Sequence, residues 1–270
     1  MDANIKLINR PKRGIIVIPA RLASTRLPNK LILQETGQPL LAYVVGNARR
    51  AVAMSDGQLQ KVVVACDDER LVAIAQEAGA QAVLTGEHHQ CGTTRIAEAI
   101  EKLGLSHGLD FVVNVQGDEP ELDPRAILDV TSALLSDENA DMATLVIAMP
   151  GGTESHKANP NVVKAVLDAR GRAIYFSRAA IPFDRQPTPP HLPSWYHHLG
   201  IYAYRTPFLM EFASWPVSTL ERQESLEQLR AIEAGRIIAA RAVPSAWAGK
   251  GIDTPDDYQA FVERWGRLVA

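Results

Sequence analysis

Three cations follow the first strongly apolar run of the chain. The run is GIIVI at residues 14–18, and the segment IPARLASTRLPNK that continues it contains Arg21, Arg26 and Lys30. The segment also offers hydroxyl and backbone N–H groups, and phosphates bind well to such fixed donors beside compact positive charge. It lacks the glycine pattern of a Walker loop or a dinucleotide-binding fold. A solvated basic loop is the alternative, but three cations at the end of a strand favour an anion site.

Two further segments carry carboxylates at the ends of predicted elements. In VNVQGDEPEL (113–122), an apolar run leads into Asp118 and Glu119, and a carboxylate at a strand end can hold Mg²⁺ together with phosphate oxygens. A solvated polar turn is an equally good interpretation. In GIDTPDD (251–257), Asp253 precedes a helix start, either as a second metal ligand or because carboxylates are favoured there. Spacing alone does not choose between these roles.

Polar side chains also flank apolar runs in the second half of the chain. They are Ser177, Arg178, His197, His198 and Tyr202. No HExxH motif or second histidine at metal-ligand spacing is present, so the sequence does not favour a zinc site. The only cysteines, Cys66 and Cys91, are far apart and form no CxxC pair, which argues against a disulfide framework. Cys66 is interpreted as a small buried residue rather than a nucleophile.

The first half of the chain alternates between strands and helices that would position these groups. Apolar runs rich in β-branched residues predict buried strands, and helical spacing with capping residues predicts helices. The strands are expected at 14–18, 61–65, 81–84 and 111–115, and the helices at 40–53, 67–79, 93–104 and 123–135. This alternation indicates an α/β fold with βαβ units and a mostly parallel sheet, whose binding sites gather at the carboxyl ends of the strands.

The second half is less regular. Strands are predicted at 143–149, 162–168, 199–204 and 237–243, and helices at 218–235 and 254–268. Helix caps are expected from Asp67 or Asp68, from Asp123, and from Thr254 together with Asp257. The proline-rich stretch 184–195 is expected to be an exposed loop. Residues 1–270 show no repeat or convincing linker, so they predict a single domain, with residues ~150–215 as a smaller excursion.

Composition excludes several classes of function. Hydrophobic residues make up 46% and charged residues 22%, the balance of a soluble globular protein. The net charge of −3 provides no overall basic field, so neither nucleic acid nor an anionic membrane surface is an expected partner. No run approaches the ~18 apolar residues of a membrane helix, and the N-terminus has no secretory signal. We therefore expect a cytoplasmic protein without membrane insertion, in which any anion site is local.

A series of segments, in order, resembles the 3-deoxy-manno-octulosonate (KDO) cytidylyltransferase family, the CMP-KDO synthetases. They are IPARLASTRLPNK, ACDDERL, HQCGTTRIAEAI, VNVQGDEPEL, NPNVVKAVLD, YFSRAAIPFDR, HHLGIYAYR, LERQESLEQLR and GIDTPDD. The resemblance runs from about Ile15 to about Phe261. The first motif and QGDEP are shared more widely among sugar nucleotidyltransferases, whereas FSRAAIP, HLGIYAYR and LEQLR are closer to the KDO enzymes.

The resemblance implies a fold and a reaction. The fold would be a mostly parallel nucleotide-binding sheet flanked by helices, like that of the nucleotide-diphospho-sugar transferases. A smaller α+β segment would serve sugar binding and dimerisation. The reaction would convert CTP and KDO into CMP-KDO and pyrophosphate with Mg²⁺ as cofactor, for lipopolysaccharide biosynthesis. The family is cytosolic and commonly homodimeric.

The resemblance also implies roles for residues at matching positions. The nucleotide-binding residues would be Ala20, Arg21, Ser24, Arg26, Lys30, Cys66, Gly92, Thr93, Arg95, Gln116 and Asp118. The sugar-binding residues would be Arg178, His198, Tyr202, Glu224, Glu227 and Gln228. Asp118 and Asp253 would bind the metal, and together with Arg21 and Lys30 they would form the catalytic set.

The chain departs from the family pattern at several positions. Cys91 and Thr94 stand where the usual SGTER motif has Ser and Glu, Phe183 stands where Trp is usual, and residues 186–196 have a sequence of their own. Cytidylyl transfer to another acidic sugar, such as 8-amino-KDO or a sialic-like acid, is therefore the main alternative. A glycosyltransferase would normally have a DxD-type motif, and QGDEP has no such pattern. A non-catalytic nucleotide-binding protein would not need both carboxylates.

Overall fold

The computed structural model describes residues 11–186, 188–189 and 192–266. Its strands are β1 (Gly14–Ala20), β2 (Leu59–Cys66), β3 (Gln81–Leu84), β4 (Phe111–Asn114), β5 (Met142–Met149), β6 (Lys164–Leu167), β7 (Ala173–Ser177), β8 (Trp195–Arg205) and β9 (Ile238–Ala242). Its α-helices are α2 (Leu40–Met54), α3 (Glu69–Glu77), α4 (Gly92–Lys102), α5 (Pro124–Ser136), α6 (Glu154–Ala158), α7 (Thr206–Ser214), α8 (Thr219–Glu224), α9 (Gln228–Glu233) and α10 (Pro255–Gly266). Two 3₁₀ helices are η1 (Lys30–Ile32) and η2 (Ser245–Trp247).

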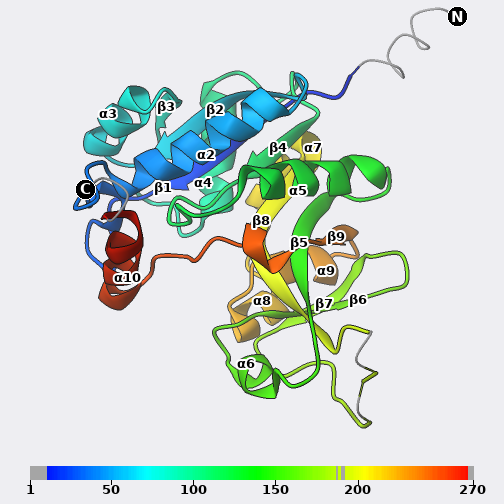
Figure 1. Ribbon diagram of the computed structural model, residues 1–270. Coiled ribbons are helices and arrows are strands. Elements are labelled where there is room, and N and C mark those ends of the chain that lie inside the picture. Colours follow the sequence, from blue (N-terminus) through cyan, green and yellow to red (C-terminus); the bar gives the residue numbers. More distant parts are fainter. Residues whose placement is uncertain (1–10, 187, 190–191, 267–270) are drawn as a thin grey trace, which may run out of the picture.

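The strands form one nine-stranded sheet with the central order β3-β2-β1-β4-β8-β5-β9 (Figure 1). Strands β3, β2, β1 and β4 pair in parallel, and so do β5 and β9. Strand β8 runs antiparallel to both β4 and β5, and β6 and β7 continue from it as an antiparallel pair. The predicted α/β class with a mostly parallel sheet is confirmed, with one reversed strand in its middle.

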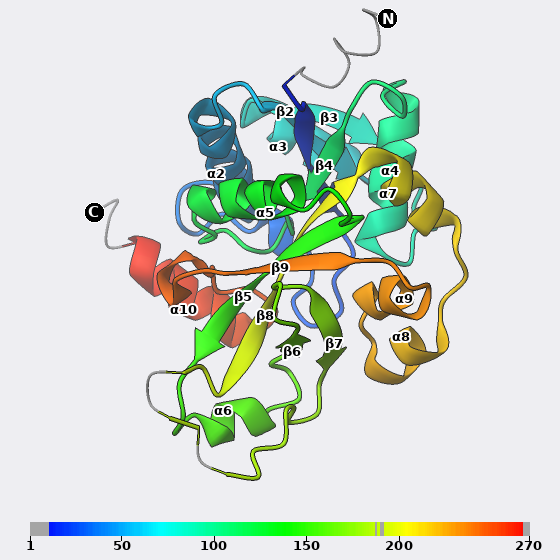
Figure 2. The same ribbon diagram turned by 90° about the vertical axis from the view of Figure 1, so that its right-hand side faces the viewer.

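Alternate residues of β1 show how the sheet is covered on both faces. Ile16 and Ile18 are fully buried in a core shared with residues of α2, α5 and α10, whereas Ile15 and Val17 are buried with residues of α4 and α7. Figure 2 shows α8 and α9 on the same side as α4 and α7. Because successive side chains point to opposite faces, an uninterrupted apolar run is what a doubly covered strand requires. Each fully buried side chain of this size contributes about 1.5–3 kcal/mol.

The helices begin at the predicted capping residues, and the structure decides between Asp67 and Asp68 as the cap of α3. The carboxylate of Asp68, rather than Asp67, accepts the backbone N–H of Arg70 and caps α3. Asp123 caps α5 in the same way. Thr254 and Asp257 bond reciprocally at the start of α10, which is the predicted capping box.

The predicted helix over 218–235 is wrong. The chain forms α8 and α9 instead, separated at Ser225, whose φ of 51° is left-handed. The buried side chain of Leu226 follows this break, so tertiary packing overrides a locally continuous helical pattern. Strand β7 and helices α6 and α7 were not predicted as such.

Some predictions stay untested. Part of the expected loop 184–195 (residues 187, 190 and 191) and the last residues of the expected helix 254–268 lie outside the described residues. The residues from α6 to β7 lie at the opposite end of the molecule from α3 (Figure 1). The single-domain prediction, with ~150–215 as an excursion, stays a prediction. Every helix in the described part of the chain is too short or too polar to cross a membrane.

Candidate functional site

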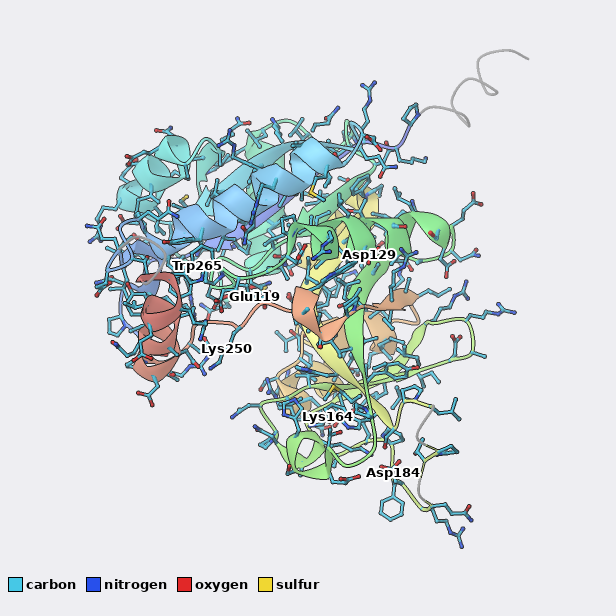
Figure 3. The ribbon with its side chains drawn as sticks, viewed as in Figure 1. Glu119, Asp129, Lys164, Asp184, Lys250 and Trp265 are labelled. Carbon is cyan, nitrogen blue, oxygen red and sulfur yellow. The ribbon has the colours of Figure 1, made fainter. Side chains whose placement is uncertain are left out.

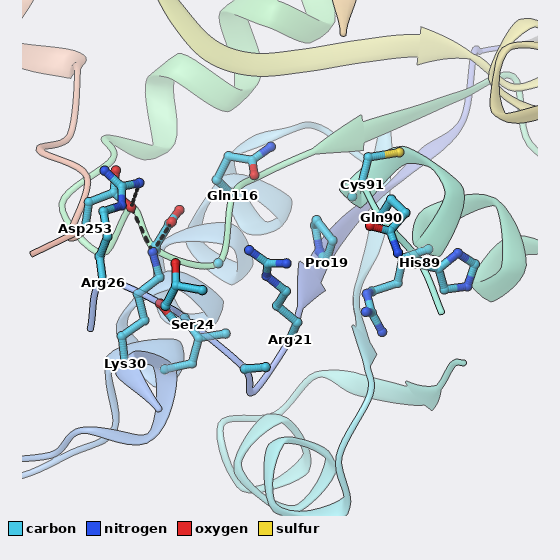
Figure 4. Close-up of a pocket in the computed structure, with 17 residues that line it drawn as sticks. Pro19, Arg21, Ser24, Arg26, Lys30, His89, Gln90, Cys91, Gln116 and Asp253 are labelled. Atoms are coloured by element: carbon cyan, nitrogen blue, oxygen red, sulfur yellow. Dashed lines mark hydrogen bonds and ion pairs between the residues drawn. The ribbon is translucent and has the colours of Figure 1, made fainter. Parts of the chain in front are cut away.

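A cavity of about 300 Å³ lies at the carboxyl ends of the parallel strands (Figure 4). The loops that follow β1 and β4, the start of α4 with the loop before it, and Asp253 line the cavity. Figure 4 shows Lys30, Arg26 and Asp253 on one side and Cys91 with His89 on the other. The strand ends therefore converge where an α/β sheet is expected to bind its ligand.

Most residues implied in nucleotide binding line this cavity. They are Arg21, Ser24, Arg26, Lys30, Gly92, Arg95, Gln116 and Asp118. Three others lie behind the cavity wall. Ala20, Cys66 and Thr93 are fully buried, with the Cys66 thiol donating to the backbone oxygen of Val64. Burial raises the pKa of that thiol to about 12, so Cys66 is an inert packing residue.

Asp67 fixes the start of the cation-rich loop. Its carboxylate accepts the backbone N–H of Leu22 at 2.8 Å and pairs with the guanidinium of Arg95 at 3.2 Å. Arg95, which is only 3% exposed, also donates to the hydroxyl of Thr85 at 2.8 Å and to the backbone oxygen of Gly86 at 3.2 Å. One buried ion pair thus ties together the loops that follow β1, β2 and β3.

Lys30 joins the two predicted metal-binding carboxylates. Its Nζ lies 2.5 Å from Asp118 Oδ2, 3.1 Å from Asp253 Oδ1 and 3.0 Å from the backbone oxygen of Ile252. Asn29, at a left-handed φ of 55°, turns the chain into η1 just before this lysine. The backbone N–H of Ile252 also donates to the backbone oxygen of Asp118 at 2.9 Å. The two carboxylates therefore converge on a single cation although they are far apart in the sequence.

The other cations of the loop remain accessible. Arg26 is exposed and pairs with Asp253 at 3.0 Å. Arg21 is exposed as well, and among the residues that the structure describes no side chain pairs with its guanidinium. An exposed arginine on a cavity wall is available to a phosphate as a bidentate donor.

The residues implied in sugar binding lie outside the cavity wall and form three groups. In the first, Glu224 accepts from the Ser177 hydroxyl at 2.5 Å and from the backbone N–H of Arg178 at 2.9 Å. The Arg178 guanidinium donates to backbone oxygens of Glu224 at 2.7 Å and Pro160 at 3.0 Å. Buried Lys164 donates to the backbone oxygen of Arg178 at 2.5 Å, so this arginine is held from several sides.

The second group connects α9 to the start of α4. Glu227 accepts a hydrogen bond from the Thr93 hydroxyl at 2.7 Å. Cys91 lies on the cavity wall, and the pKa of its thiol is raised first by burial and second by the negative charge of Glu227. Next to it, Gln228 is 4% exposed and its Nε2 is a buried donor without a hydrogen-bond partner in the described structure. Such unpaired donors are rare in native proteins and mark a place for an acceptor.

Two neighbouring histidines on β8 are buried in their neutral form. Burial, followed by the charge of a nearby histidine, lowers the pKa of His198 to about 3 and that of His197 to about 4. His198 Nε2 lies 3.0 Å from the hydroxyl of Thr144, and its ring is 5.5 Å from that of Tyr202. The neutral imidazole is therefore a hydrogen-bonding group rather than a charge.

These histidines predict a pH-dependent stability. Between their folded pKa values and the ordinary value of 6.5, the unfolded chain binds more protons, so stability rises with pH in this window. Each group contributes a slope of up to about 1.4 kcal/mol per pH unit. Urea unfolding from pH 4.5 to 7 should show a shallower slope for His198→Asn than for the wild type. The exposed His107→Asn variant should keep the wild-type slope, and equal slopes in all three proteins would refute the assignment.

The sequence suggested Glu119 only as one of two carboxylates at a strand end, and it gave no role to His89. Glu119 follows Asp118 and is half-buried. Its pKa is raised to about 8, first by burial and then by the negative charges of Asp118 and Asp253. Figure 3 shows Glu119 in the middle of the molecule, well separated from Lys164 and Asp184. His89 lines the cavity. Both follow predicted strands closely, so the rule of strand ends could have identified them.

Comparisons with known proteins agree with this geometry. A family model described as cytidylyltransferase matches residues 15–238. A 3-deoxy-manno-octulosonate cytidylyltransferase from Acidovorax sp. (strain JS42) is 46% identical over 258 residues, which are 90% of this chain and 94% of the relative. One from Rhodopirellula baltica is 43% identical over 256 residues, covering 93% and 97%.

Solved structures extend the comparison to the fold. CMP:2-keto-3-deoxy-manno-octonic acid synthetase complexed with CTP superposes with a TM-score of 0.81 at 35% identity, covering 96% of this chain and 98% of that one. A 4-diphosphocytidyl-2C-methyl-D-erythritol synthase from Anaerococcus prevotii, at 12% identity and a TM-score of 0.56, shares the fold alone. With the family model and the relatives covering nearly the whole length, the chain belongs to the cytidylyltransferase family and, within it, to the 3-deoxy-manno-octulosonate cytidylyltransferases.

Proposed function

We propose that this protein activates KDO by transferring the cytidylyl group of CTP, releasing pyrophosphate and forming CMP-KDO for lipopolysaccharide biosynthesis. The observation that carries the proposal is the convergence of Arg21, Arg26, Lys30, Asp118 and Asp253 on one cavity at the strand ends. Family membership supports the same reaction. The cavity combines cations for a triphosphate with carboxylates for a hard metal ion.

The reaction requires positioning and charge neutralisation. The anomeric hydroxyl of the sugar attacks the α-phosphorus in line and releases its proton to water, so that an O–P bond forms while the bond to the bridging oxygen of pyrophosphate breaks. Arg21 and Lys30 offset the charge of the β- and γ-phosphates as they leave, and Arg26 reaches the same chain of phosphates. These cations preserve the attacking geometry and stabilise charge that develops in the transition state.

Mg²⁺ is the proposed cofactor, held by Asp118 and Asp253. The fit rests on the donor set, since two carboxylates that already share one ammonium group offer oxygen ligands converging on one point. When bound, the ion supplies Lewis-acid polarisation of the α-phosphate. The chain's own part is to bring both carboxylates together, and the Ile252–Asp118 backbone bond and the capping of α10 help to position them.

The acidic sugar is proposed to bind between β8 and the segment that joins α8 to α9. Arg178, His198, Tyr202, Glu224, Glu227 and Gln228 are its proposed contacts. The unpaired Gln228 Nε2 is a donor for a sugar oxygen, and the neutral His198 a further hydrogen-bonding group. The Arg178 guanidinium is proposed to meet the sugar carboxylate, a planar group that suits its geometry.

Removing the Gln228 amide tests the sugar site. The Gln228→Met variant is expected to raise KM for KDO at least about tenfold, the cost of a hydrogen bond worth about 1.5 kcal/mol, and to leave KM for CTP unchanged. Its melting temperature should not fall, because the substitution deletes a buried donor that has no partner. Steady-state kinetics with each substrate varied, and calorimetry, measure both. A melting point several degrees lower with an unchanged KM for KDO would show a structural role instead.

The reaction itself is tested by pyrophosphate release. Purified protein with Mg²⁺ and CTP is assayed with KDO, 8-amino-KDO and a sialic acid in parallel, and ATP, GTP and UTP replace CTP as controls. Turnover of KDO with CTP alone is the expected result. Preferential turnover of 8-amino-KDO would establish the alternative sugar. No turnover with any of these sugars, from protein that still binds CTP, would overturn the proposal.

We propose further that the protein acts in the cytoplasm as a homodimer. Two large apolar side chains of the excursion support an interface there, Ile174 at 55% and Phe183 at 88% exposure. Light scattering of the wild type and of Phe183→Ser at the same concentration tests this. A monomeric wild type would contradict it.

A further inference from the structure

Beside the nucleotide cavity, three side chains bring together atoms that ligate transition metals. Among the described residues, His88, His89 and Glu98 each place one nitrogen or carboxylate oxygen within 4.8 Å of the others. Two imidazoles and a carboxylate are a typical donor set for Zn²⁺ and similar divalent ions. The sequence gave no sign of this group, because Glu98 lies on α4, nine residues beyond the histidine pair.

The group is held by the local fold. Glu98 reaches back from α4 and accepts the backbone N–H of Gly86 at 3.1 Å. The His88 ring lies against Gly86 so closely that a Cβ there would be 2.3 Å from His88 Nδ1. The two imidazole rings are 4.3 Å apart. The loop between β3 and α4 thus presents both histidines to the same helix.

The hydrogen bond at His89 Nδ1 is coupled to the tautomer of this ring. The hydroxyl of Thr94 lies 3.1 Å from the backbone oxygen of Cys91, which can only accept, and 3.0 Å from His89 Nδ1. When the hydroxyl donates to Cys91, Nδ1 donates to the hydroxyl and Nε2 keeps a lone pair. When the hydroxyl donates to Nδ1, Nε2 carries the proton.

His89 Nε2 faces the carboxylate of Glu98. It contacts Glu98 Oε2, and either a proton on Nε2 or, in the tautomer that carries its proton on Nδ1, a metal ion between the two atoms satisfies both. Histidine ligands of metals are characteristically oriented by a hydrogen bond at their other nitrogen, and Thr94 provides it here. Thr94 is one of the positions at which the chain departs from the family pattern.

Both oxygens of the Glu98 carboxylate are held by the local fold. Lys102 pairs with Oε1 at 2.7 Å, and the Gly86 N–H donates to Oε2 at 3.1 Å, so Oε2 lies on the side of the histidines. His88 is exposed, so its ring can turn toward a common ion.

We propose that His88, His89 and Glu98 bind one divalent transition-metal ion of the Zn²⁺ class, with water completing a tetrahedral site. This site differs from the carboxylates at Asp118 and Asp253 in its nitrogen ligands. Mg²⁺ is a harder ion and prefers all-oxygen coordination. We therefore expect Mg²⁺ at the two aspartates and the transition-metal ion at the histidines. The proposal is independent of the reaction proposed above.

The test is Co²⁺ binding to the full-length protein after chelator treatment, in the presence of millimolar Mg²⁺. The visible absorption of tetrahedral Co²⁺ reports the geometry, and Zn²⁺ competition gives the affinity. We expect one Co²⁺ per chain, displaced by Zn²⁺ but not by Mg²⁺. His88→Ala should weaken binding at least about tenfold, whereas the exposed His107→Ala should not.

Two further results decide between a metal and a proton. Glu98→Gln, which removes the charge and keeps the shape, should also weaken Co²⁺ binding, and circular dichroism confirms that each variant is folded. Equal Co²⁺ affinity in the wild type and His88→Ala, or an octahedral spectrum, would overturn the proposal. Absence of Co²⁺ binding would overturn it too, and would assign the His89–Glu98 contact to an Nε2–H···Oε2 hydrogen bond.

Discussion

Replacing Asp118 with asparagine is expected to lower kcat about a thousandfold, equivalent to about 4 kcal/mol of transition-state stabilisation. Asparagine keeps the size and the amide oxygen but removes the negative charge that faces Lys30 and, by our proposal, Mg²⁺. Binding of CTP in the presence of a chelator should change only a few-fold, because the phosphates meet the cations of the loop after β1. Steady-state pyrophosphate release and calorimetric titration measure the two effects separately.

The matched control is Asp256→Asn. Asp256 lies in the first turn of α10, close in the sequence to Asp253, but its side chain is exposed and outside the cavity. Its kcat should equal that of the wild type. A kcat within about tenfold of the wild type for Asp118→Asn would refute the metal assignment, and equal loss in both variants would indicate a general effect of charge.

The strands and helices of the first half of the chain could be predicted from local sequence, but the order of the strands in the sheet and the reversed β8 could not. Continuous apolar runs identify strands buried on both faces, and capping carboxylates such as Asp123 mark helix starts. The rule that ligands bind at the carboxyl ends of such strands then places Arg21 and Asp118 at the site before any contact is known. These features depend on short stretches of chain, which is why a single sequence reveals them.

What could not be predicted depends on contacts between distant segments. The meeting of Asp253 with Asp118, beside the backbone bond from Ile252 to Asp118, follows from no spacing rule, and only the family resemblance implied it. The break at Ser225 is similar. The helical pattern continues through it, but the turn lets Glu224 face Ser177 while Glu227 faces Thr93. Local propensity costs a few tenths of a kcal/mol per residue, less than such buried hydrogen bonds contribute.

Replacing Arg95 with methionine is expected to destabilise the fold by about 3 kcal/mol and to lower the melting temperature by roughly 6–12 °C. Methionine fills similar space without charge, so it leaves the largely buried Asp67 carboxylate without its partner. The same substitution removes the donors to Thr85 and Gly86. Thermal and urea unfolding measure the loss, and the exposed Arg49→Met is the control, with a change within about 0.5 kcal/mol.

A second substitution separates the contribution of the ion pair to stability from the contribution of side-chain packing. Asp67→Asn combined with Arg95→Met should recover part of the stability, because the uncompensated buried charge is then gone. CTP affinity should be lower in the double variant than in the wild type, since Arg95 lines the cavity and the amide that replaces the Asp67 carboxylate is a weaker acceptor for the backbone N–H of Leu22 at the start of the cation-rich loop. If Arg95→Met alone were as stable as the wild type, the buried pair would not anchor the loop. If the double variant were the least stable of the three, the loss would come from packing and hydrogen bonds, and the loop would owe its position to those contacts.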